Sequence, residues 1–143
     1  MIFTNVKTGK VRRYVYKNMF LNYGKYAIAQ RMAGDSGAGE ITYCALGTGT
    51  TAPAKTDTGL QTELARKLIS VREYLNEVFT GTTYFTTSEA VGVLKEAALF
   101  GNGVGRIASS IPGSGQIYTR VAINRTKSSN DTLTLQWAVT IVI

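Results

Sequence analysis

The residue types that usually perform catalysis are scarce in this sequence. It contains no histidine and a single cysteine, Cys44. Histidine is the commonest general base and metal ligand, and it is the usual partner of a serine or cysteine nucleophile. One cysteine cannot form an internal disulfide or a cysteine-rich zinc site. Only a mechanism built on carboxylates or lysine remains open, so we expect no enzyme, no cofactor and no metal site.

Two local patterns could still carry chemistry. A glycine-rich stretch, residues 47–53, follows a predicted strand, which is the position of a phosphate-binding loop. Such a loop ends in Gly-Lys-Ser/Thr at the start of a helix, and here Lys55 has no preceding glycine. Glu73 and Glu77 flank a predicted turn, so surface carboxylates explain them better than a glycosidase pair. We expect a rigid surface loop and two solvated carboxylates.

The positive charge of the chain is concentrated near its start. The 143 residues include 16 Lys+Arg and 9 Asp+Glu, for a net charge of +7. Seven of the basic residues precede the first acidic residue, Asp35, and the remainder of the chain is neutral. The candidate partner-binding residues in this region are Lys7, Lys10, Arg12, Arg13, Tyr14, Tyr16 and Lys17.

Two interpretations of this basic region compete. It is either a solvated basic strand or a docking arm for an acidic protein surface or a phosphate backbone. Tyr14 and Tyr16 alternate with basic residues, as a base-stacking platform requires, but a half-buried strand shows the same alternation. The sequence has no RNA-binding aromatic signature and no helix-turn-helix pattern. We expect a protein partner and not nucleic acid.

The N-terminal part is predicted to be an extended arm followed by a helix. β-branched and aromatic residues dominate residues 2–16 on both sides of a Thr-Gly turn signal. Asn22 can cap a helix that runs to about Ala33, next to a glycine stop. The chain therefore divides into a basic N-terminal arm, residues 1–17, and a single β-sandwich-like domain, residues 18–143.

One strand and a second helix are predicted in the middle of the chain. Residues 41–46 are apolar on both faces, which predicts a central or covered strand. Asp57 or Thr58 then predicts the N-cap of a second short helix that reaches Arg66. Gln61 is placed to close a capping box at the start of this helix.

The C-terminal half is predicted to consist of strands. Alternating or β-rich segments are separated by Gly, Asn, Ser and Pro turn residues at hairpin spacing. The predicted strands are 68–74, 78–87, 93–100, 106–111, 116–124 and 132–143. Trp137 lies on the apolar side of the last one, which favours core packing over glycan stacking. The sequence thus predicts a mainly β fold, an antiparallel β-sandwich or open barrel with two short helices and an extended N-terminal arm.

Three ordered segments carry a more specific signal. The first, residues 22–29, reads N-Y-G-K-Y-A-I-A. The second, residues 43–66, contains A-L-G-T-G-T-T-A-P, T-D-T-G-L and E-L-A-R. The third, residues 94–137, contains L-K-E-A-A-L-F, T-R-V and K-S-S-N-D-T-L-T-L-Q-W. In this order they resemble a recurrent family of small tailed-bacteriophage structural proteins, found among tail-fibre, baseplate and related virion components.

The resemblance covers nearly everything from Asn18 onward and leaves the basic arm unmatched. This chain departs from the family pattern at Ala98, where the family tends to have glycine. It also departs at Lys127-Ser128, which replaces a tighter Lys-Thr turn. Neither position is catalytic, because the family implies no catalytic residues.

The resemblance implies a virion structural protein, made in the host bacterial cytoplasm and released by lysis. Its partners would be other virion proteins and copies of itself in symmetric assemblies, with no membrane and no small-molecule substrate. Within this class the leading hypothesis is a tail-associated fibre, baseplate or adaptor component, and a capsid-surface or head-attachment protein is the alternative. Outside this class, a basic nucleic-acid-binding domain and a carbohydrate-binding β-sandwich remain as alternatives.

Overall fold

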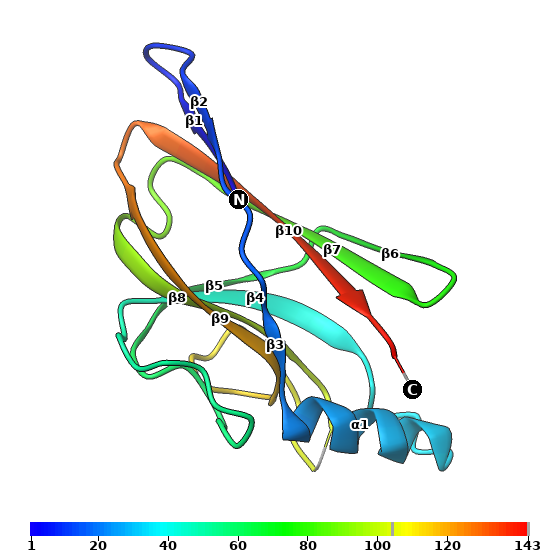
Figure 1. Cartoon of the computed structure of the whole chain (residues 1–143). Helices are drawn as coiled ribbons and strands as arrows, with labels where there is room; N and C mark the ends of the chain where they lie inside the picture. Colours follow the sequence, from blue (N-terminus) through cyan, green and yellow to red (C-terminus); the bar gives the residue numbers. More distant parts are fainter. Residues whose placement is uncertain (104, 143) are drawn as a thin grey trace.

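The computed structural model describes residues 1–103 and 105–142, which form a mainly β molecule with one helix (Figure 1). The elements in chain order are β1 (Ile2–Asn5), β2 (Val11–Arg13), β3 (Met19–Phe20), α1 (Asn22–Met32), β4 (Ile41–Gly47), β5 (Glu63–Leu68), β6 (Val71–Leu75), β7 (Val78–Phe85), β8 (Gly92–Gly101), β9 (Gln116–Lys127) and β10 (Asp131–Thr140).

The strands form two five-stranded sheets. Sheet A has the order β2-β1-β10-β7-β6, and sheet B has the order β3-β9-β8-β4-β5. Neighbouring strands are antiparallel throughout both sheets. The prediction of a mainly β, antiparallel fold is therefore confirmed.

The main core lies between the facing surfaces of the two sheets. It joins Leu133 and Trp137 of sheet A to Cys44, Leu46 and Leu99 of sheet B in one buried cluster. β10 alternates strictly between buried and more exposed residues, so one face of this strand meets the core and the other meets water. The predicted apolar face of the last strand is confirmed. Trp137 is only 5% exposed, so it offers no surface on which a sugar could stack.

Sheet B is buried on both of its faces. Ala45, Ala98 and Phe100 point away from sheet A and form a second buried cluster with Leu21 and Ile117. β4 lies between β8 and β5 within the sheet. The prediction that residues 41–46 form a central, covered strand is therefore confirmed.

The first predicted helix is present as α1, which packs against β9. Leu21 is its N-cap and Asn22 is its first residue, so the predicted cap was one position too late. The helix approaches the sheet closely at Gly24, where an added Cβ would lie 2.9 Å from the Cα of Tyr118. Within residues 1–103 and 105–142, no helix is long and apolar enough to cross a membrane.

The second predicted helix is wrong. Residues 55–62 form a turn followed by bends and irregular backbone, and β5 begins at Glu63. The side chains expected to cap this helix bind elsewhere. Asp57 accepts a hydrogen bond from the Ala54 N–H (2.8 Å), and Gln61 accepts from the backbone N–H groups of Thr50 and Thr51 (2.7 and 2.9 Å). These bonds stabilise an irregular loop instead of a helical turn.

Two of the predicted strands are also corrected. The segment 68–74 is divided between β5 and β6, because the chain leaves sheet B at Ile69 and enters sheet A at Val71. Residues 106–111 form a loop with one isolated bridge, between Gly103 and Arg106.

The N-terminal arm is an integral part of sheet A. We call β1, β2 and their connecting turn the N-terminal hairpin; Figure 1 shows it in blue beside β10. Phe3 of β1 is opposite Leu133 of β10 and is fully buried. The boundary between residues 1–17 and 18–143 therefore crosses one hydrophobic core. The chain then passes along the open edge of the molecule to β3 in sheet B (Figure 1).

Candidate functional site

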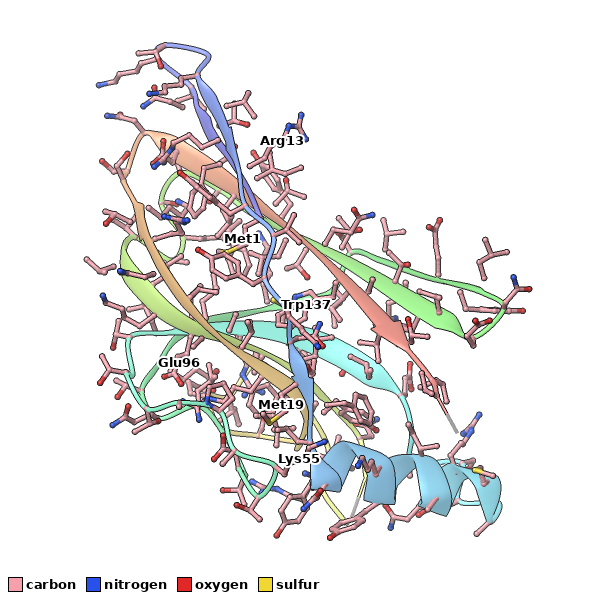
Figure 2. The ribbon with its side chains drawn as sticks, viewed as in Figure 1. Met1, Arg13, Met19, Lys55, Glu96 and Trp137 are labelled. Atoms are coloured by element: carbon pink, nitrogen blue, oxygen red, sulfur yellow. The ribbon has the colours of Figure 1, made fainter. Side chains whose placement is uncertain are left out.

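A buried ion-pair network lies on sheet B, centred on Arg120 of β9 and Glu96 of β8. Their side chains are 3% and 1% exposed, and Arg120 Nη2 is 2.8 Å from Glu96 Oε2. Arg120 Nη1 is also 2.6 Å from Asp57 Oδ2. Arg120 Nη2 also donates to the carbonyl oxygen and hydroxyl of Thr51 at 3.0 and 2.9 Å. We call these four residues the Arg120 network (Figure 2 labels Glu96).

The Arg120 network fastens the loop between β4 and β5 to the sheet. Glu96 accepts hydrogen bonds from the backbone N–H groups of Gly49 (3.0 Å), Gln61 (3.0 Å) and Thr62 (2.8 Å). A Cβ added at Gly49 would lie 2.5 Å from Glu96 Oε1, so only glycine allows this close approach. Charge-assisted hydrogen bonds of this kind are stronger than neutral ones, and burial strengthens them further.

These bonds also decide how the glycine-rich stretch can act. A phosphate-binding loop offers its backbone N–H groups to the ligand. Here the Gly49 N–H is bound by Glu96, and the N–H groups of Thr50 and Thr51 are bound by Gln61. The donors are used within the protein, so the stretch is organised as a structural loop.

A second buried arginine holds the loop that precedes β9. Arg66 of β5 forms an ion pair with Glu63 and lies 4.4 Å from the ring centroid of Phe100. Its Nη1 donates to the carbonyl oxygens of Ser109 and Ser114 at 3.1 and 2.9 Å. Two loops on the same sheet are thus fixed by an arginine–glutamate pair each.

The buried reactive groups are held in their protonated forms. Burial raises the pKa of the Cys44 thiol to about 12, and Cys44 Sγ accepts the Trp137 indole N–H at 3.3 Å. Burial likewise raises the pKa of Tyr118 to about 12. A thiol that is neutral at pH 7 is a poor nucleophile. Within the described part of the chain, no three acidic, cysteine or histidine side chains are grouped to hold a metal ion.

The structure divides the predicted docking residues into two groups. Lys7, Lys10, Arg13 and Lys17 are exposed, and their side chains form no ion pair with any described residue. Figure 2 shows Arg13 projecting from the N-terminal hairpin. These four cations remain available to a partner.

The other three predicted docking residues attach the hairpin to the core. Arg12 Nη2 is 2.9 Å from Asp131 Oδ2. The Tyr14 ring packs edge-on against Phe3 with centroids 6.1 Å apart, and the Arg125 guanidinium covers Tyr14 at 3.6 Å. Tyr16 is half-buried and lies 5.8 Å from the same guanidinium. The tyrosine rings are therefore used internally and do not form a free stacking platform.

Asp131 joins the N-terminal hairpin to the turn before β10. Its Oδ2 also accepts the Ser128 N–H at 3.0 Å. Burial alone would raise the pKa of Asp131, but the hydrogen bonds from Ser128 and the charges of Arg12 and Lys127 outweigh it, so this pKa is lowered.

This lowered pKa predicts a loss of stability in acid. A carboxyl whose folded pKa lies below its unfolded value stabilises the protein above the unfolded pKa, near 3.8, and this contribution is lost as the pH falls through the folded pKa. Asp131→Asn should lower the free energy of unfolding by roughly 1–2 kcal/mol at pH 7 and flatten its fall in acid. Urea unfolding between pH 7 and pH 2 measures both; parallel curves for parent and variant would contradict the assignment.

The sequence predicts a strand over residues 68–74 but not that its second part, β6, is an exposed edge strand of sheet A. All five residues of β6 are exposed, including Tyr74 at 85% and Leu75 at 74%. Glu73 of this strand and Glu77 of the following turn form no ion pair with any residue in 1–103 or 105–142. Beside β6, Tyr74, Phe79 and Ile141 contribute to the lining of a mainly apolar cavity of about 400 Å³.

The chain was compared with known proteins. No protein-family model matches it, and the curated proteins contain no match.

Proposed function

We propose that this chain is a bacteriophage virion structural protein: a β-sandwich module that assembles in many symmetric copies in a tail-associated fibre, baseplate or adaptor. The observation that carries this proposal is the convergence of the motif residues on the Arg120 network. Thr51 and Asp57 belong to the second segment of the resemblance, and Glu96 and Arg120 belong to the third. Residues far apart in the sequence therefore meet at one place.

This convergence supports a scaffold role for the motifs. Arg120 and Asp57 are separated by 63 positions, and Arg120 and Glu96 by 24. Their contacts fix the loop between β4 and β5, while the Glu63–Arg66 pair of the same resemblance fixes the loop before β9. A particle component needs a rigid surface that fits the same neighbours in every copy. The shared residues provide that rigidity.

A non-enzymatic role is supported by where the ionisable groups lie. The buried carboxylates and guanidinium groups of sheet B bind one another and the backbone. Among the exposed and unpaired charges described above, Arg13 and Glu73 instead lie on the two edge strands of sheet A. Groups at opposite edges of a sheet suit contacts with neighbouring proteins better than joint action on one substrate.

The alternatives have weaker support. For nucleic acid, the exposed cations of the N-terminal hairpin could contact phosphates, but Tyr14 and Tyr16 are packed against Arg125. For carbohydrate, Trp137 lies in the core. A capsid-surface or head-attachment protein remains the alternative within the virion class, because its structural requirements are the same.

The proposal is tested by locating the protein in particles. Particles released by lysis of the source cells should contain this chain, and gold-labelled antibodies against it should decorate the tail in repeated, symmetric positions. Label on the head alone would select the capsid-surface alternative. Absence of the chain from purified particles would refute a virion role. Salt-sensitive binding of the isolated protein to DNA or RNA, with that absence, would select the nucleic-acid alternative.

A further inference from the structure

Sheet A has two open edges that can accept another strand. β2 forms one edge and β6 forms the other, with β1, β10 and β7 between them. Each of the four pairings across the sheet is antiparallel, so β2 and β6 run in the same direction. A second copy placed in the same orientation beside the first would bring β6 of one copy parallel to β2 of the other. Exposed strand edges present unpaired N–H and C=O groups for such pairing.

The two edge strands have related sequences with opposite charges at one position. Residues 11–15 read Val-Arg-Arg-Tyr-Val, and residues 71–75 read Val-Arg-Glu-Tyr-Leu. When each residue of the first segment is aligned with the residue 60 positions later, apolar residues align with apolar residues and Tyr14 aligns with Tyr74. The same alignment places Arg13 beside Glu73. The same offset aligns Lys17 with Glu77, beyond the ends of both strands. The strands are therefore complementary when they are placed side by side in parallel.

The side chains at this offset lie on matching faces of the sheet. Arg12 is paired with Phe3, the buried core residue of β1. Tyr74 is paired with Phe79 of β7, which packs against the same core. Directly paired residues share a face of the sheet, so Arg12 and Tyr74 are on the core side. Because successive residues of a strand point to opposite faces, Arg13 and Glu73 both point away from the core. A copy added in the same orientation would bring them together on one face.

The backbone groups at the two edges are compatible with the same offset. Tyr14 exchanges hydrogen bonds with Met1, so its neighbour Arg13 directs its N–H and C=O to the open edge. In β6, the two-residue turn after Leu75 makes Leu75 and Val78 of β7 a hydrogen-bonded pair. The backbone N–H and C=O groups of Arg72 and Tyr74 therefore point to the open edge. In a parallel ladder, a residue bonds to the two residues that flank the one opposite it. These backbone positions allow Arg13 to lie opposite Val71, Glu73 or Leu75, and the opposite charges of Arg13 and Glu73 select Glu73.

We propose that β2 of one copy pairs in parallel with β6 of a second copy, with Arg13 opposite Glu73. This inference rests on the proposed function, which requires many copies. Apolar side chains on the outer face would meet in the same interface, since Val11 and Val71 are 46% and 47% exposed.

The two arginines that the offset also aligns do not oppose this pairing. Arg12 is bound to Asp131 at 2.9 Å, and Arg72 is bound to Glu40 at 2.6 Å. Each positive charge is therefore balanced within its own copy. The contact joins two different edges, so it repeats from copy to copy and builds a ring or a filament in place of a two-fold dimer.

Charge-reversal variants test this pairing by sedimentation velocity at low salt. Arg13→Glu alone and Glu73→Arg alone should each weaken self-association about tenfold per contact, because an attraction becomes a repulsion. The double variant should associate like the parent. An equimolar mixture of the two single variants should also associate, because each supplies the edge that the other has lost. Lys55→Glu, a charge reversal at an exposed loop position distant from both edges (Figure 2), should change nothing.

Three results would overturn the pairing: a parent protein that remains monomeric at all concentrations, single variants that associate like the parent, or a mixture that fails to recover. Virion incorporation is measured independently by the antibody labelling described above. Labelled tails together with unaffected single variants would refute this interface and leave the proposed function standing. Self-association that follows the charge pattern in a protein absent from particles would support the interface and refute the virion role.

Discussion

Replacing Arg120 with methionine should lower the free energy of unfolding by about 3–5 kcal/mol. The substitution keeps most of the side-chain volume but removes the cation between Glu96 and Asp57. Glu96 is 1% exposed, so its charge would remain buried without its cationic partner. Guanidinium unfolding followed by tryptophan fluorescence measures the change, since Trp137 is the single tryptophan.

The double variant Arg120→Met/Glu96→Gln distinguishes two costs: the loss of the Arg120–Glu96 ion pair, and the burial of the Glu96 carboxylate without a cationic partner. It should recover part of the loss, because a neutral amide is cheaper to bury than an unpaired carboxylate. Lys95→Met is the control: Lys95 neighbours Glu96 on β8, and among the described residues its ammonium group bonds to Asn124 alone, so its effect should stay within about 0.5 kcal/mol. Parent-like stability of Arg120→Met would show that the network does not hold the loops.

Replacing Trp137 with alanine should cost about 3–5 kcal/mol of unfolding free energy. The side chain fills the space between the two sheets, and truncation leaves a cavity there. It also removes the indole N–H that Cys44 Sγ accepts. Thermal or urea unfolding followed by far-UV circular dichroism measures the loss.

The matched control is Gln136→Ala, one residue earlier on β10, where the side chain is exposed. This variant should unfold within about 0.5 kcal/mol of the parent. A Trp137→Ala variant that unfolds like the parent but loses binding on a glycan array would favour the carbohydrate alternative. Loss of stability without any glycan binding by the parent would agree with the core position.

The strands of the C-terminal half could be predicted because their patterns are local. β10 alternates between apolar and polar residues, and that alternation needs no knowledge of its neighbours. The prediction of the second helix was wrong because the contacts that decide the structure there are not local. Its capping signals at Asp57 and Gln61 were real local patterns, but Arg120 and the Thr50 N–H bind those side chains in the folded chain. Contacts across such separations are invisible to a short sequence window.

The docking role of the N-terminal residues stays a prediction, and the structure adds which of them are exposed and which contact the core. Their sequence shows charge, whereas their burial depends on the pairing of β1 with β10. Arg12 and Tyr14 hold the hairpin in place, while Arg13 remains exposed. The β6 edge was missed because exposure on both faces is set by what packs against a strand. Only the folded chain shows that β6 is an edge strand and that all five of its residues are exposed.

The position of β1 beside β10 has a consequence for synthesis. Thr4 pairs with Thr132, which the ribosome adds 128 residues later. At ordinary rates of translation this delay is on the order of ten seconds. Phe3 therefore cannot pack against its partner Leu133 until β10 has been made, so this part of the core forms after β1 to β9 have been synthesised. During this interval we expect the lysines around the hairpin turn to disfavour association of nascent chains, because like charges repel.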